Sequence, residues 1–107
     1  MAKRAKYALV FAPETIDHVR AIERRYHRLI QQVIDEQLSR IPDHVTRNRK
    51  RLELPAPFGA TWELRFGPDN RFRVFYEINE AGRTVEILAI GVKERNCLLI
   101  AGEEFES

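Results

Sequence analysis

The sequence has few of the residues that crosslink a chain or bind metals. Its one cysteine, Cys97, excludes an intramolecular disulfide framework and does not form a metal site alone. With three scattered histidines, a zinc site is not expected. No apolar run approaches the roughly 20 residues that cross a bilayer, and the basic start MAKRAK is not followed by the apolar segment of a signal peptide. We therefore expect one cytoplasmic domain, residues 1–107, with no metal or cofactor.

Basic and acidic residues are nearly balanced in number but unevenly distributed. Residues 40–73 contain eight basic side chains and four acidic ones, whereas residues 77–107 contain seven acidic and three basic ones. A basic middle segment suggests a polyanionic partner that contacts one surface. The same asymmetry also occurs in proteins that bind no polyanion, so composition leaves both interpretations open.

Residues 62–78 alternate apolar and polar side chains, which predicts a β-hairpin with one apolar face. Only a five-residue loop at 67–71 keeps the apolar residues of both strands on that face. This register sets Arg65 directly opposite Arg73. Because two facing cations on a sheet repel each other, we expect them to hold an oxyanion, most simply a phosphate. The alternative is a solvated surface balanced by acidic neighbours such as Glu63.

The N-terminal third predicts a short buried strand at residues 7–11, followed by helical spacing of apolar residues. A single helix over residues 13–40 would be about 42 Å long, too long for a domain whose radius of gyration should be about 13 Å. No glycine or proline marks a boundary, but we expect a break near residues 23–26. The two resulting antiparallel helices are predicted to pack on the sheet.

Residues 42–60 are punctuated by proline and glycine and are expected to form a loop. Four bases fall within five positions of this segment, just before the hairpin that carries the paired arginines. They suit either a grip on a phosphate backbone or a solvated turn. These bases are Arg47, Arg49, Lys50 and Arg51.

A third strand is predicted at residues 84–91, in a register that places Arg73 opposite Ile90. Phe75 lies on the arginine face and is expected either to stack on a base or to pack under a loop. Residues 96–100 suit an edge strand or a helical turn. The cations at the ends of these strands are expected to lie together, namely Arg71, Arg73, Lys93 and Arg95.

The order of strand, two helices, basic loop and three meandering strands resembles the RelE/ParE superfamily of type II toxin–antitoxin toxins. The motifs that carry this resemblance are WELR, RFRVFYEI, TVEILAIG and KER. The stretch WELRFGPDNRFRVFYEI is the most specific and is also similar to the HigB-type branch, so a RelE/HigB-like toxin is favoured. The resemblance covers nearly the whole chain. It implies an α+β fold with two N-terminal helices on one face of a mainly antiparallel twisted sheet and a concave, basic opposite face.

The resemblance further implies a toxin that a cognate antitoxin protein neutralises. Many relatives act on the ribosome and cut mRNA, whereas the ParE branch binds DNA gyrase and leaves RNA intact; a non-toxic interaction module of the same fold is a third reading. We favour a ribosome-dependent, metal-independent endoribonuclease that inhibits translation. In this reaction the ribose 2′-hydroxyl attacks the adjacent phosphate, which requires a base, cations and an acid.

Residue by residue, Arg73 matches the family's most persistent active-site arginine, Arg65 a basic residue on the neighbouring strand, and Lys93 a basic residue after the last core strand. Glu63 stands where RelE has a lysine, and Leu99 about where RelE has a late tyrosine. Glu63 would act as the base if the arginines keep it ionised; otherwise it is a plain salt-bridge partner. The expected catalytic residues are Arg65, Arg73, Lys93 and Glu63. The expected RNA-binding residues are Arg47, Arg49, Lys50, Arg51, Arg71 and Arg95.

Overall fold

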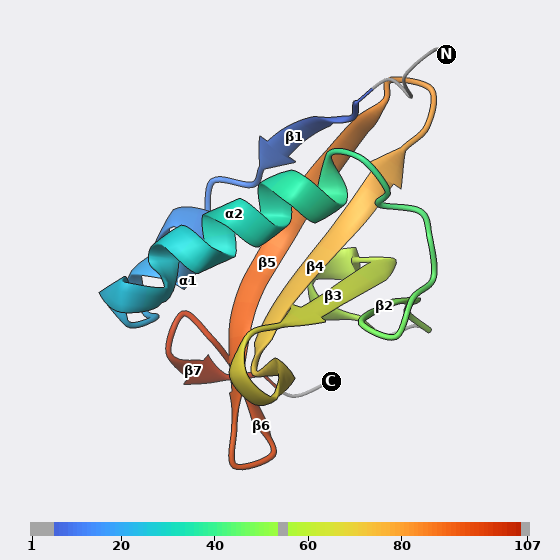
Figure 1. Cartoon of the computed structure of the whole chain (residues 1–107). Coiled ribbons are helices and arrows are strands. Elements are labelled where there is room, and N and C mark those ends of the chain that lie inside the picture. The colour runs from blue at the N-terminus through green and yellow to red at the C-terminus, as the bar shows by residue number, and fades with distance from the viewer. Residues whose placement is uncertain (1–5, 54–55, 106–107) are drawn as a thin grey trace.

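A strongly twisted sheet forms the frame of the molecule (Figure 1). The computed structural model describes residues 6–53 and 56–105, and within them seven strands form one sheet. The strand order is β2-β3-β4-β5-β6-β7, and β1 pairs with β5 in parallel. The elements are β1 (Ala8–Phe11), α1 (Thr15–Arg20), η1 (Arg24–Tyr26), α2 (His27–Leu38), β2 (Arg49–Arg51), η2 (Pro57–Gly59), β3 (Trp62–Phe66), η3 (Pro68–Asn70), β4 (Phe72–Asn79), β5 (Thr84–Glu94), β6 (Cys97–Ile100) and β7 (Glu103–Glu104).

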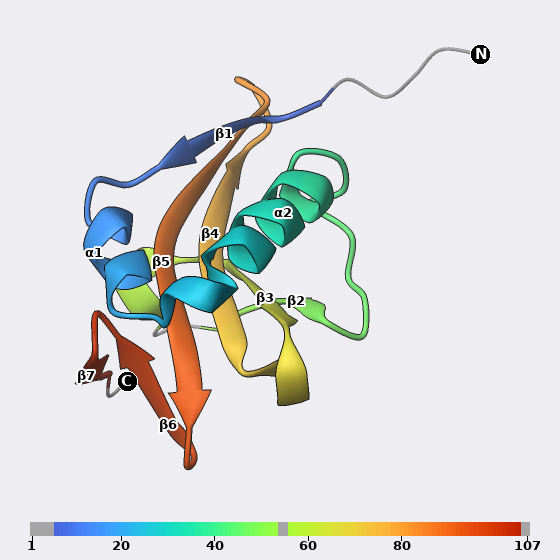
Figure 2. The same cartoon turned by 60° about the vertical axis from the view of Figure 1, so that its left-hand side comes forward.

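The helical region is divided near residues 23–26, as predicted. α1 ends at Arg20, and the short η1 turn leads into α2 at His27. Figures 1 and 2 show both helices on one side of the sheet, with α2 crossing β4 and β5. Ile30, Ile34 and Leu38 of α2 are buried at helical spacing. The predicted α+β arrangement is thereby confirmed. No helix in the described residues is long and apolar enough to cross a membrane.

The β3–β4 hairpin has the register expected from its apolar pattern. Arg65 faces Arg73, and the loop between the strands contains five residues. Gly67 has a φ of 84°, and a Cβ there would lie 2.4 Å from the ring of Phe72, so the turn requires glycine. The large apolar residues of the hairpin point under the helices. They are Trp62, Leu64, Phe66, Phe72, Val74 and Tyr76.

Three local predictions are corrected or settled by the structure. β1 is not buried, because it lies at the sheet margin and Val10 and Phe11 remain 48% and 38% exposed. The basic loop contains a strand, β2, whose pairing with β3 positions its side chains. Residues 97–100 form strand β6, antiparallel to the end of β5. Figure 2 shows this C-terminal hairpin at the end of β5 far from the N-terminus.

The register of β4 and β5 differs from the simple prediction because of a bulge. Tyr76 pairs with Ile87 as expected, but Phe75 pairs with Ala89, so Leu88 is an extra residue in β5. Beyond this point Arg73 faces Gly91 rather than Ile90. The bulge therefore reverses which residues of the second half of β5 point under the helices.

Candidate functional site

The carboxylate of Glu63 lies among cations on the outer face, which we define as the sheet face opposite α1 and α2. Its Oε1 accepts a hydrogen bond from Arg65 Nε at 2.9 Å, and its Oε2 accepts one from Arg73 Nη1 at 3.4 Å. Lys50 Nζ is 4.0 Å from Oε1. Glu63 is only 5% exposed, although α1 and α2 lie on the other face (Figure 1). The charges of the paired arginines are therefore balanced by Glu63, as in the alternative interpretation of the sequence, and the phosphate contact stays a prediction.

Strand register brings these residues together. Arg65 faces Arg73 across β3 and β4, while Lys50 of β2 faces Glu63. Because alternate residues of a strand share a face, Glu63 stands two positions from Arg65 on the same side. Arg73 also donates from Nε to the carbonyl of Asn70 at 3.0 Å. The guanidinium of Arg73 is thus oriented from two directions.

The cluster has an excess of positive charge. Lys50, Arg65 and Arg73 carry three positive charges against the single negative charge of Glu63, which leaves an excess of two. Burial lowers the pKa of Arg73, the charge of Glu63 opposes this change, and the charge of Arg65 adds to it. An arginine with these neighbours remains charged at neutral pH. A second anion would be attracted to this group.

Lys93 reaches the outer face because of the bulge at Leu88. An unbroken register would place Lys93 on the same face as Ile87, under the helices. With one extra residue, Val92 turns inward and is 8% exposed, while Lys93 turns outward. The backbone N–H of Lys93 donates to the carbonyl of Arg71 at 2.7 Å. Lys93 is therefore a strand residue and not, as expected, one that follows the last core strand.

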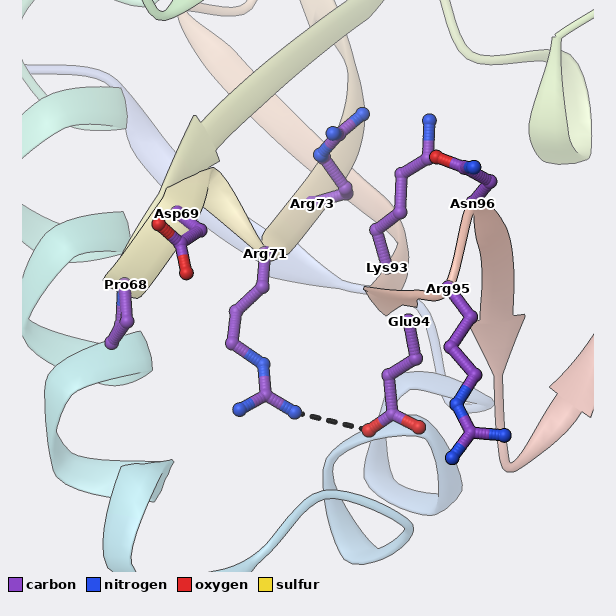
Figure 3. Close-up of a pocket in the computed structure, with 8 residues that line it drawn as sticks. All are labelled: Pro68, Asp69, Arg71, Arg73, Lys93, Glu94, Arg95 and Asn96. Carbon is purple, nitrogen blue, oxygen red and sulfur yellow. Dashed lines mark hydrogen bonds and ion pairs between the residues drawn. The ribbon is translucent and has the colours of Figure 1, made fainter.

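Arg73 and Lys93 line an open hollow of about 490 Å³ between the η3 turn and the β5–β6 turn. In Figure 3 the side chains of Arg73, Lys93 and Asn96 extend to one side of this hollow. Arg71 extends to the other side and pairs with Glu94 at 3.0 Å. Arg95 lies beside Glu94 in the same view. The four cations predicted to gather here line one hollow but divide between its two ends.

The basic residues at positions 47–51, in the segment predicted to be a loop, also point in different directions. Lys50 faces Glu63, whereas Arg51 stacks over the ring of Trp62 at 5.4 Å. Arg47 lines a groove between α2 and β3 that Arg65 also lines. The prediction that Arg49 contacts RNA is wrong, because Arg49 is 1% exposed. Its guanidinium donates hydrogen bonds to the carbonyl of His44 and to the side chain of Gln37. It holds β2 against α2 and is unavailable to a nucleic acid.

Residues 9–97 match the family model described as the ParE toxin of the type II toxin–antitoxin system parDE. The chain belongs to the ParE toxin family. The predicted RelE/ParE superfamily is thereby confirmed, although the matching model is that of ParE and the sequence motifs favoured a RelE/HigB-like branch.

Among solved structures, this ParE-family toxin is similar to the RelBE2 toxin–antitoxin complex from Mycobacterium tuberculosis. The two chains are 22% identical with a TM-score of 0.67, and the match covers 83% of this chain and 100% of the other. At this identity the likeness concerns the fold. No similar sequence was found among functionally curated proteins.

A second hollow of the toxin, of about 280 Å³, adjoins Glu63 on the outer face. Phe75 is packed at its base and is only 2% exposed, so it packs beneath a loop and the C-terminal hairpin and does not offer its ring to a base. The polar residues that line this hollow are Glu63, Lys93 and Asn96, and the apolar ones include Pro57, Leu98 and Phe105. Asn96, Leu98 and Phe105 were not predicted as site residues. The available signal was the apolar run at residues 97–100, which the sequence left open between an edge strand and a helical turn.

The histidines line neither of these two hollows, whereas Cys97 stands between Asn96 and Leu98, which line the second one. His18 is 4% exposed, and its Nδ1 accepts a hydrogen bond from the N–H of Ile90 at 3.2 Å, which joins α1 to β5. Burial lowers the pKa of His18. The charge of Glu104 raises the pKa of Cys97. In the part of the chain that the structure describes, no group of three His, Cys, Asp or Glu residues is placed to hold a metal ion.

Proposed function

We propose that this toxin is a ribosome-dependent mRNA endonuclease whose site consists of Glu63, Arg65, Arg73 and Lys93. The observation that supports it best is the position of Glu63. Its carboxylate is held between two arginines and lines a hollow together with Lys93. A base, a pair of cations and a proton donor are therefore present within one small area of the outer face, which are the groups that RNA transesterification requires.

In the proposed reaction Glu63 accepts the proton of a ribose 2′-hydroxyl, and the 2′-oxygen attacks the adjacent phosphorus. Arg73 and Arg65 stabilise the negative charge that develops on the phosphate oxygens. The bond to the 5′-oxygen breaks as this oxygen takes a proton from Lys93. The products are a 2′,3′-cyclic phosphate and a free 5′-hydroxyl. The chemistry requires no metal.

The ion pairs of Glu63 suggest an exchange of anions on substrate binding. In the free protein the carboxylate occupies the position on Arg65 and Arg73 that a phosphate would take. The arginine side chains are 35% and 12% exposed, so an incoming phosphate reaches Arg65 first. When the phosphate replaces the carboxylate, Glu63 is released toward the 2′-hydroxyl while its charge is still balanced by Lys50.

The remaining cations extend this site along an RNA backbone. Arg47, Arg51, Arg71 and Arg95 would contact phosphates before and after the one that is cut. The partners proposed for the chain are the ribosome with its mRNA and, by analogy with the RelBE2 complex, a cognate antitoxin protein. The site of action is the cytoplasm.

Two observations favour a second function, inhibition of DNA gyrase. The family model that matches is that of ParE, and Glu63 is already neutralised by neighbouring cations. A site locked in this state would bind a partner without chemistry, and the outer face would then serve only as a contact surface.

Expression of the toxin in bacteria, followed by mapping of RNA 5′ ends, separates the two functions. The nuclease predicts new ends within translated mRNA that carry a 5′-hydroxyl, with no early DNA-damage response. Gyrase inhibition predicts the DNA-damage response and unchanged RNA ends. The second pattern would contradict the nuclease proposal.

A further inference from the structure

We propose that the second hollow, beside Glu63, binds the nucleobase of the nucleotide whose 2′-hydroxyl reacts, and that Asn96 contributes to the choice of that base. This inference rests on the proposed nuclease function and extends it to the recognition of single-stranded RNA.

The two hollows of the outer face are neighbours with different chemistry. The larger one is lined by four cations and two carboxylates, Asp69 and Glu94, so its excess of positive charge suits phosphate oxygens. The smaller one has apolar walls formed by Pro57, Leu98 and Phe105. Lys93 and Asn96 line both, and the hydrogen bond between Arg73 and Glu63 links the wall of one to the wall of the other. A nucleotide has the same arrangement, with a charged phosphate at one end and a flat, largely apolar base at the other.

The position of Glu63 determines which nucleoside enters. The 2′-hydroxyl that attacks belongs to the nucleotide on the 5′ side of the scissile phosphate. If Glu63 accepts the proton of this 2′-hydroxyl, the C2′ atom of the ribose lies beside the smaller hollow, because Glu63 lines that hollow. The base is attached to C1′, the neighbouring ring atom, so it is the base of this nucleotide that reaches the apolar walls.

The dimensions of the smaller hollow suit a single base. Its volume of about 280 Å³ is near the lower limit of ligand pockets, roughly 300–1,000 Å³. Leu98 and Phe105 are half-buried, so part of each side chain is available for contact. Apolar contact of this kind does not by itself distinguish the four bases.

Asn96 supplies a group that does distinguish bases. Its amide offers both a hydrogen-bond donor and an acceptor, and unstacked RNA bases are read through hydrogen bonds to their edges. Asn96 is exposed and has a φ of 67°, a left-handed conformation that asparagine tolerates. The β5–β6 turn therefore presents this amide at the border of the hollow.

The test compares Asn96→Asp with Asn79→Asp in the toxin bound to ribosomes that translate a defined mRNA. Asn79 is the control, because it is an exposed asparagine at the end of β4, lines neither hollow, and as aspartate keeps the oxygen that accepts the N–H of Gly82. The readout is the nucleotide on the 5′ side of each cut, counted over many sites. We expect Asn96→Asp to change the preference for one base by about threefold to tenfold, the effect of one hydrogen bond, and Asn79→Asp to leave it unchanged.

Two further variants keep the result clear. Asn96→Gly retains the left-handed turn and removes the amide, so it should flatten the preference. Leu98→Ala removes an apolar wall and should slow cutting at all sites alike. If the parent cuts and all variants show its base preference, the inference is overturned while the nuclease stands. If the parent cuts no RNA, the nuclease proposal fails and the inference fails with it.

Discussion

The two faces of the sheet are formed by alternate residues of the same strands, yet their side chains are buried by different interactions. Under the helices, large apolar side chains from β3, β4 and β5 pack against α1 and α2. On the outer face, Phe75, Ala89 and Ile100 form a small apolar cluster beneath the C-terminal hairpin. Beside this cluster, the buried carboxylate of Glu63 is paired with Arg65 and Arg73.

This difference separates stability from function. Apolar contacts under the helices are non-directional and leave no polar partner to exchange. The ion pairs of the outer face are directional, and a carboxylate held by guanidinium groups can be replaced by another anion. The face under the helices therefore holds the fold, while the outer face carries the ion pairs on which the proposed function depends.

The largest expected effect comes from comparing two arginines, Arg73 and Arg71, at the two ends of the larger hollow (Figure 3). Arg73→Ala should reduce the rate of mRNA cutting by about 10²–10³-fold, because it removes a donor aimed at the developing charge. Arg71→Ala should reduce it less than about fivefold, because Arg71 is a half-buried ion-pair partner of Glu94 that stacks on Tyr26 at the far end of the hollow. Single-turnover cutting on programmed ribosomes measures both rates. Equal losses for the two variants would mean that the sides of the hollow are equivalent.

A second pair of variants compares two arginines of β2. Arg49→Ala should lower the free energy of unfolding by about 2–4 kcal/mol, because it empties a buried site and leaves Gln37 without its partner. Arg51→Ala should lower it by less than about 1 kcal/mol, because only a stacking contact with Trp62 is lost. Urea unfolding followed by circular dichroism measures both. A small effect at Arg49 would return this residue to the RNA-binding set.

The same pair shows how far the sequence could be interpreted. The period-two pattern predicted the hairpin, its five-residue loop and the facing of Arg65 and Arg73, because one face had to be apolar. The pattern could not show which basic residue of the 47–51 segment is buried, since the pairing of β2 with β3 decides this. The bulge at Leu88 was also invisible, because it becomes favourable only when Val92 finds room under the helices.

A smaller effect is expected at Gly91, where the backbones of β5 and β6 lie close together. A Cβ at Gly91 would lie 2.8 Å from the carbonyl oxygen of Leu99, so Gly91→Ala should destabilise the protein by about 1–3 kcal/mol by displacing β6. The control is Gly82→Ala, where the nearest atom belongs to the flexible side chain of Asn79 at 3.3 Å. Thermal unfolding of both variants measures the difference. If Gly91→Ala unfolds like the parent, β6 is not tightly packed on β5.

The smallest effect concerns pH and the hydrogen bond that joins α1 to β5. Burial lowers the pKa of His18 from its ordinary value of 6.5, so the unfolded chain binds this proton more readily than the folded one. The contribution of His18 to stability is therefore complete above pH 6.5 and is lost as the pH falls below that value. His18→Asn keeps an acceptor for the N–H of Ile90 and should give a flatter dependence of unfolding free energy on pH between 7.5 and about 5. Parallel curves would contradict a buried, neutral His18.

The central claim is that Glu63 acts as a base and that its arginines bind the scissile phosphate. Glu63→Gln preserves the size of the side chain and a hydrogen-bond acceptor for Arg65, but it does not take up the proton. With purified toxin on mRNA-programmed ribosomes, we predict that this variant cuts at least about 100-fold more slowly than the parent, while it protects the same mRNA position equally well or better because the site has gained positive charge. Cutting at the parental rate would contradict the account.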